Sequence, residues 1–162
     1  MTGNPQGDVS IAVFTAYRSP FRRQTEADLA ALVAADTGLR IGIKHYPILA
    51  PDPAAAAAFA SAVLAPGGQA AHDAVHPRLS GLRGGYTKAT LGALARDAGL
   101  DPAEVFARME SDDMAARIEA TLALGRTFGF DVMPSFALTG MPVRGRVPAE
   151  ALARYVAQAH AR

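Results

Sequence analysis

The chain has 162 residues, half of them hydrophobic, which is enough for one domain with a substantial core. Its 16 basic and 15 acidic residues give a formal net charge of +1, so the overall charge indicates neither a nucleic acid nor an anionic membrane as a partner. There is no cysteine, which excludes disulfide bonds, thiolate catalysis and Cys-ligated metals.

The first eight residues are polar and lack the apolar stretch of a signal peptide. We predict that residues 1–8 are disordered or poorly ordered. The protein is then either cytoplasmic, or periplasmic with its export signal removed. No run approaches the roughly 20 apolar residues of a membrane span, because the alanine-rich run from Ala54 to Ala60 is short.

The first structural unit is a strand, a helix and a second strand. The nearly continuous apolar run from Val9 to Phe14 is typical of a strand covered on both faces. Ser19 is predicted as the N-cap and Pro20 as the first residue of the following helix, which ends near Gly38. The alternating pattern of residues 39–44 then predicts a second strand, and the three elements form a crossover unit.

The middle of the chain is almost wholly helical. An alanine-rich helix is expected to end at residues 66–68, Pro-Gly-Gly, and a shorter segment to stop at Pro77. Further helices are predicted from Thr87, from Asp101 and from Ser111, and the last two residues are expected to be N-caps.

Strand patterns return near the C-terminus. Residues 135–138 and 141–143 flank a Thr-Gly turn and predict a hairpin, in which Pro142 indicates an edge strand. Pro148 begins a final amphipathic helix that carries Leu152, Tyr155 and Val156.

Two motifs connect these elements to a known family. Residues 17–22 are Tyr-Arg-Ser-Pro-Phe-Arg, at the junction of strand and helix, and residues 132–136 are Val-Met-Pro-Ser-Phe, before the hairpin. They resemble the Tyr-x-Cys-Pro-aromatic-Cys and Thr-Pro-x-Phe motifs of the DsbA family of thiol–disulfide oxidoreductases. The similarity runs from about Val9 to the C-terminus. Ser19 and Arg22 stand where the family has its two cysteines, and Met133 precedes the proline in place of the more usual threonine or valine.

The resemblance implies an α/β protein with a thioredoxin-like fold, a central mixed sheet and an inserted helical domain. We accordingly divide the chain into the N-terminal residues 1–8, a first thioredoxin-like part (9–46), a helical insertion (47–129) and a second thioredoxin-like part (130–162). The resemblance further implies that Pro134 is a cis proline facing the former active site.

That site has lost its redox chemistry. A serine hydroxyl is a far weaker acid than a thiol, and an arginine stays protonated, so neither exchanges electrons with a disulfide. We instead expect the site to bind a peptide or small anionic ligand without a cofactor. Its predicted binding residues are Tyr17, Arg18, Ser19, Pro20, Phe21, Arg22, Met133 and Pro134.

Charge supports an anionic ligand. The N-H groups at a helix N-terminus favour anions, and Arg18, Arg22 and Arg23 surround this one. If the resemblance holds, Arg144 and Arg146 approach the same surface and complete a basic rim. The simpler interpretation of all these side chains is that they are solvated surface arginines.

A second interpretation is enzymatic. Kappa-class glutathione transferases and the related isomerases share the inserted fold and carry Ser-Pro-aromatic at the same junction, where the serine stabilises the thiolate of glutathione. Ser19 would then be catalytic and glutathione the cosubstrate. Against this, those enzymes are usually longer and have another serine where Arg22 stands.

A third interpretation is a structural interaction domain that oligomerises through its sheet edge or helical cap, although the sequence indicates no oligomeric state. His72 and His76 are spaced like two metal ligands on a helix, but Pro77 follows at once and no third ligand is evident, so we predict no metal site.

Overall fold

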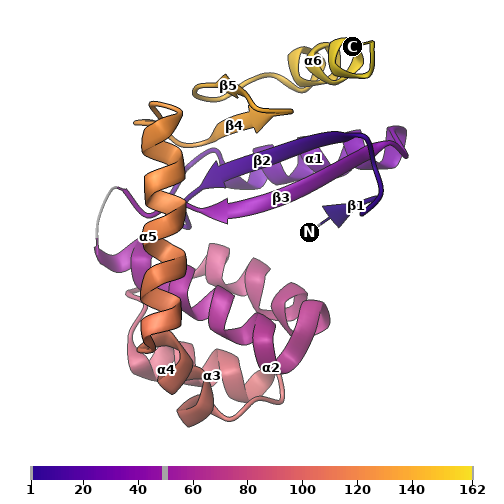
Figure 1. The fold of residues 1–162 in the computed structure, drawn as a ribbon. Coiled ribbons are helices and arrows are strands. Elements are labelled where there is room, and N and C mark those ends of the chain that lie inside the picture. Colours follow the sequence, from indigo (N-terminus) through magenta and orange to yellow (C-terminus); the bar gives the residue numbers. More distant parts are fainter. Residues whose placement is uncertain (1, 49–50, 162) are drawn as a thin grey trace. The chain divides into compact units, whose positions relative to one another are not determined.

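The computed structural model describes residues 2–48 and 51–161, which form two compact units (Figure 1). The sheet unit contains the residues up to His45 and from Leu124 onwards, and the helical unit comprises Tyr46–Ala123. The division falls within helix α5 (Asp112–Thr127), whereas the sequence places the end of the insertion at residue 129.

The sheet unit is built on a five-stranded sheet with the order β1-β3-β2-β4-β5. Its strands are β1 (Thr2–Gly3), β2 (Val9–Thr15), β3 (Leu39–His45), β4 (Ser135–Leu138) and β5 (Met141–Val143). Strands β2 and β3 are parallel and the other neighbours antiparallel, so the sheet is mixed, as predicted. Pro142 lies in the edge strand β5, where a missing N-H is tolerated.

Helices α1 (Arg22–Ala35) and α6 (Ala149–His160) share the main hydrophobic core with the sheet. Leu29 of α1 and Leu152 and Val156 of α6 pack against alternate residues of the central strands. Phe14, the next residue in β2 after the core residue Val13, contacts the ring of Phe130 at a centroid distance of 5.0 Å. Alternation along β2 therefore explains its nearly continuous apolar sequence, because both of its faces are covered.

The prediction of a disordered N-terminus is wrong for the described residues after Met1. Thr2 and Gly3 pair with Ile41 and Arg40 of β3, and the Asn4 side-chain amide donates to the carbonyl of Thr37 at 2.8 Å. Polar composition alone suggested disorder, but backbone pairing to an existing edge strand requires no apolar side chains.

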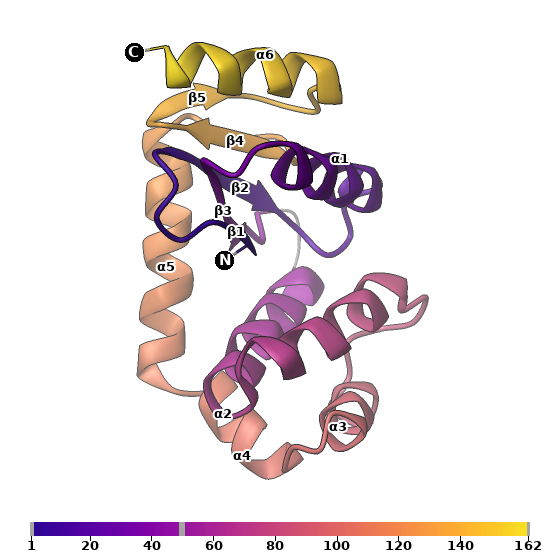
Figure 2. The same cartoon turned by 90° about the vertical axis from the view of Figure 1, so that its right-hand side faces the viewer.

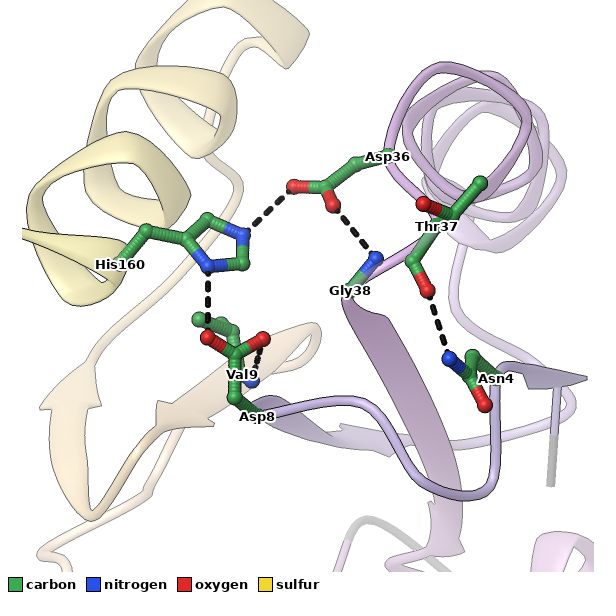
Figure 3. Close-up of polar contacts among 7 residues, drawn as sticks. All are labelled: Asn4, Asp8, Val9, Asp36, Thr37, Gly38 and His160. Atoms are coloured by element: carbon green, nitrogen blue, oxygen red, sulfur yellow. Dashed lines mark hydrogen bonds and ion pairs between the residues drawn. The ribbon is translucent and has the colours of Figure 1, made fainter.

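A histidine links the two ends of the chain within the sheet unit (Figure 3). The ring of His160, near the end of α6, lies 3.1 Å from Asp8 and 2.9 Å from Asp36, which are in the segments before β2 and after α1. We call the group of His160, Asp8 and Asp36 the His160 clasp. Gly38 leaves room for it, because a Cβ at this position would lie 2.8 Å from side-chain atoms of both Asp8 and His160. The carboxylates of Asp36 and Asp8 accept hydrogen bonds from the His160 ring and so raise the pKa of His160, and the bond with His160 lowers the pKa of Asp8.

The helical unit groups α2, α3 and α4 together with the first part of α5 (Figure 2). Its remaining helices are α2 (Pro51–Gly81), α3 (Lys88–Asp97) and α4 (Pro102–Met109). The predicted caps are confirmed at two helices, where Asp101 accepts from Ala103 N and Ser111 from Met114 N. Thr87, which was not predicted as a cap, accepts from Thr90 N at the start of α3.

The prediction that Pro77 ends a helix is wrong. The predicted interruption at residues 66–68 is confirmed at Gly68, whose φ of 62° and ψ of −165° break α2, but the chain then stays helical through Pro77 to Gly81. Val75 and Leu79, on either side of the proline, are 1% and 0% exposed. Their burial outweighs the one backbone hydrogen bond that a proline removes.

Helix α2 also contains a stretch, Ala54–Gly81, that is long and apolar enough by length and composition to cross a membrane. Gly68 interrupts this stretch, and Phe59 and Val63 within it are buried. A helix in the core of a globular unit passes the same test of length and composition.

Candidate functional site

The site begins where β2 ends. Two tight turns follow the strand: Ser19 N donates to Ala16 O at 3.0 Å, and Arg22 N donates to Ser19 O at 3.2 Å. Helix α1 starts only at Arg22, and its N-cap residue is Phe21, which makes no side-chain cap bond. The prediction of Ser19 as N-cap is therefore wrong, because an extra turn through Pro20 and Phe21 separates its side chain from the first helical N-H groups.

Ser19 faces the second motif. Its side chain is 8% exposed, and Oγ lies 3.5 Å from the carbonyl oxygen of Met133, at the outer limit of a hydrogen bond. The peptide bond between Met133 and Pro134 is cis. The two motifs that are far apart in the sequence are thus neighbours in the sheet unit. Met133 is half-buried, Pro134 buried and Pro20 exposed.

Arg22 lies inside the protein, contrary to its predicted place in a surface rim. Its side chain is 2% exposed, and Nε lies 2.7 Å from Glu26 Oε1, one turn further along α1. The guanidinium lies over the Tyr17 ring, 3.8 Å from the ring centre. Tyr17 is 3% exposed and stacks on His45, with 5.1 Å between ring centres. Neither Arg22 nor Tyr17 is presented to a ligand.

Other side chains of the site are exposed. Phe21 and Val132 are 45% and 46% exposed. The guanidinium of Arg146 lies 5.8 Å from the centre of the Phe21 ring, within the range of a cation–π contact. We call the exposed group of Phe21, Val132 and Arg146, together with Met133, the site surface.

Arg144 and Arg146 differ in their partners. Arg144 forms an ion pair with Asp131, and that hydrogen bond holds the pKa of Asp131 below its usual value. Arg146 instead lies over Phe21. Of the two arginines expected at the rim, Arg146 is thus the one that contacts a residue of the site. Arg18 and Arg23 are exposed on either side of the buried Arg22 in the sequence.

Sequence reasoning missed Ser135. Its side chain is fully buried; Oγ donates to the carbonyl of Val132 at 2.7 Å and accepts from the N-H of Gly145 at 3.2 Å. These two bonds join the loop that carries Val132 and Met133 to the loop that carries Arg146. A hydroxyl directly after Pro134, at the start of an apolar strand, was the available signal, because a buried polar group requires partners.

The histidine pair lies in the helical unit. The rings of His72 and His76 are 5.1 Å apart, and His72 Nδ1 is 3.4 Å from Asp73 Oδ1. Burial lowers the pKa of His72 more than Asp73 raises it. Among the described residues, no group of three or more His, Asp or Glu side chains is arranged to hold a metal ion.

The nearly neutral net charge conceals a difference between the units. The sheet unit has ten basic and six acidic residues, and the helical unit six basic and nine acidic. The unit that carries the site surface is therefore the basic one, which favours an anionic ligand there.

Comparison with known proteins identifies the family. A family model described as Thioredoxin matches residues 1–158. The chain belongs to the thioredoxin family. No curated protein sequence matches the chain.

Solved structures of this family include close matches to the whole fold. A thioredoxin-like oxidoreductase from Silicibacter pomeroyi DSS-3 is 32% identical, with a TM-score of 0.87 over 99% of this chain and 91% of that chain. A periplasmic thioredoxin-like protein from Salmonella enterica serovar Typhimurium is 22% identical, with a TM-score of 0.82 over 99% of this chain and 89% of its own.

The thiol–disulfide exchange protein alpha-DsbA2 from Wolbachia pipientis is 18% identical, with a TM-score of 0.83 over 97% of this chain and 84% of its own. These matches confirm the predicted fold, a thioredoxin-like sheet with a DsbA-like helical insertion. This thioredoxin-family chain has no cysteine with which to carry out dithiol exchange.

Proposed function

We propose that this protein is a redox-inactive, DsbA-like member of the thioredoxin family that binds a short acidic peptide segment with an apolar side chain. The site surface would hold the segment. Among the described residues, the large apolar side chains that are well exposed are Phe21, Leu64, Leu124 and Val132. Two of these four, Phe21 and Val132, lie in the two segments that meet at the contact of Ser19 with Met133. This concentration, beside Arg146, is the observation that carries the proposal.

Each part of the site surface has a role in this proposal. An apolar ligand side chain would cover Phe21 and Val132 and remove their surface from water. Arg146 would donate two parallel hydrogen bonds to a ligand carboxylate, a geometry that suits a guanidinium better than an ammonium group. Ser135, through its bonds to Val132 O and Gly145 N, would keep the apolar and charged parts of the surface together.

The proposal differs from the sequence prediction in its choice of cation. Arg22 was expected to meet the ligand, but its side chain is buried against Glu26 and Tyr17. Arg146 takes that role here, with Arg18 and Arg23 as exposed arginines that raise the local positive potential.

Calorimetric titration with the peptide Ac-Ala-Phe-Glu, which carries two carboxylates, tests this function. The neutral control is Ac-Ala-Phe-Gln with an amidated C-terminus. We expect the acidic peptide to bind and the neutral one to bind at least about tenfold more weakly, with the difference reduced at high salt. Equal affinity for both peptides, or no binding at millimolar concentration, would contradict the proposal.

Arg146→Gln is the matched variant. It should weaken binding of the acidic peptide about tenfold and leave the melting temperature unchanged, because Arg146 is exposed. The control is Arg154→Gln, an exposed arginine on α6 of the same unit, which should bind like the wild type.

The alternative is glutathione-dependent catalysis by Ser19. The favourable observation is the long contact of Ser19 Oγ with Met133 O, 3.5 Å, which leaves the hydroxyl available for a stronger partner such as a thiolate. Its 8% exposure counts against access. Calorimetric titration with glutathione tests this alternative. Binding that is abolished in Ser19→Ala would favour a glutathione-dependent enzyme, and no binding at millimolar glutathione would contradict one.

We also propose a cellular compartment for this protein, taken from the description of a similar structure. The Salmonella protein is described as periplasmic, so we place this chain in the same compartment. A cell fractionation experiment that recovers the full-length protein only with cytoplasmic markers would contradict the placement.

A further inference from the structure

Four residues of the site form a column of two charged side chains followed by two rings, of which Arg22 and Tyr17 are buried and Glu26 and His45 half-buried. Glu26 contacts the guanidinium of Arg22, which lies over the ring of Tyr17, which in turn stacks on the ring of His45. The column connects the first turns of α1 with the loop after β2 and with the last residue of β3.

Burial makes these contacts strong. A guanidinium stays charged when buried and therefore needs a counter-charge, which Glu26 supplies at 2.7 Å. A cation–π contact is worth more when water is excluded, and both Arg22 and Tyr17 are less than 4% exposed. The contact between these two side chains is thus a firm link.

The link closes the loop that carries Phe21. Tyr17 is the first residue of the 17–22 loop and Arg22, which is also the first residue of α1, is its last, so their contact holds the two ends of the loop together. Within the loop, the carbonyl of Phe21 accepts a hydrogen bond from Thr25 Oγ1 at 2.9 Å. The backbone of Phe21 is therefore fixed from both sides while its side chain remains exposed.

We infer that Arg22 is a positioning residue, which holds the 17–22 loop closed through Tyr17 and so presents Phe21 at the site surface. It does not contact the ligand. The effect of this residue on affinity rests on the proposed function, but its effect on the loop does not. Arg22, which stands where the DsbA family has its second cysteine, would thus stabilise the loop that presents part of the site surface.

Proton NMR of the free protein tests the loop directly. The stacking of His45 on Tyr17 predicts a His45 ring signal shifted by the ring current of the tyrosine, and a His45→Gln variant assigns that signal among the four histidines. In Arg22→Met this signal should move towards the value of an unstacked histidine. In Arg22→Lys, which keeps a cation, part of the shift should return. Arg154→Met, the same change on the exposed face of α6, should have no effect.

Peptide affinity tests the consequence for binding. Arg22→Met should bind Ac-Ala-Phe-Glu about tenfold more weakly than the wild type, because Phe21 is no longer held in place. Arg22→Lys should recover part of the loss. If Arg22→Met does not fold, Glu26→Gln serves instead, since it keeps an acceptor for the guanidinium and removes the charge.

The outcomes separate this inference from the proposed function. An unchanged His45 signal and unchanged affinity in Arg22→Met would overturn the inference. A wild type that does not bind the peptide would overturn the proposed function, while the His45 signal would still decide the role of Arg22. Loss of affinity in Arg22→Met with an unmoved His45 signal would also contradict the inference, because it would indicate direct contact with the ligand.

Discussion

Two basic side chains near opposite ends of β2 differ in burial and in the segments that they join. Arg22, in the helix that follows the strand, is buried between Glu26 and Tyr17. His160 lies between Asp8 and Asp36 beside the start of the strand, and its side chain is 31% exposed. The first contact joins residues close in the sequence, whereas the second joins the N-terminal segment to the last helix.

The different burial of Arg22 and His160 suits the two side chains to different structural roles. Water weakens the exposed His160 clasp, and a histidine loses its proton near neutral pH, so this clasp is adjustable and contributes little on its own. The Arg22 side chain is only 2% exposed, and arginine is not a residue that switches its charge between pH 5 and 8. The buried cation is therefore suited to permanent positioning and the exposed one to a pH-dependent link.

Removal of the buried cation should have the largest effect on stability. Arg22→Met leaves the Glu26 carboxylate without this partner, which we expect to cost about 2 kcal/mol, less than for a fully buried pair because Glu26 is 30% exposed. Urea unfolding measures the change, with Arg154→Met as the control. A loss no greater than that of the control would show that the buried pair does not support the fold.

Removal of the buried Ser135 hydroxyl should have the second largest effect on stability. Ser135→Ala removes the partner of Val132 O and of Gly145 N at a site without exposure, at a cost of about 1–2 kcal/mol. The same unfolding experiment on Ser10→Ala, a half-buried serine in β2, should give a smaller change. If the two variants unfold alike, the Ser135 bonds are not what holds the two loops together.

The His160 clasp should give the smallest effect, and one that depends on pH. Because the folded state raises the pKa of His160, the clasp stabilises fully below the unfolded pKa of about 6.5 and is lost as pH rises through the higher folded value. The lowered pKa of Asp8 means that its share is present above about pH 4 and is lost as pH falls further.

Melting temperatures of the wild type and His160→Gln test this dependence. The difference between the two proteins should be largest near pH 5.5, within the window from about 4 to 6.5, and should shrink at alkaline pH. A difference that stays constant from pH 5.5 to alkaline pH would show that His160 acts by packing alone.

Much of the fold could be predicted from sequence because its signals are local. The continuous apolar run of β2, the capping residue Asp101 and the hairpin with Pro142 at its edge each depend on neighbours in the chain, and all three predictions are confirmed. The DsbA-like fold was predicted from the motifs at residues 17–22 and 132–136.

What the sequence could not give depends on distant contacts. The strand at Thr2–Gly3 exists because β3 offers an unpaired edge, and the helix passes Pro77 because Val75 and Leu79 are buried. The site follows the same pattern. Its location was predicted, but Arg22 was assigned to the surface because a charged residue is expected there unless a partner such as Glu26 is known to be in reach.

Amide chemical-shift mapping during titration with Ac-Ala-Phe-Glu tests the central claim most directly. The account predicts that the perturbed amides cluster at Phe21, Val132, Met133 and Arg146, at the end of β2 where the site surface lies. The amides of Asp8 and Gly38, beside the His160 clasp, should not move. Perturbations centred on the clasp or spread over the helical unit, or none at saturating peptide, would contradict a ligand-binding role for the former active site.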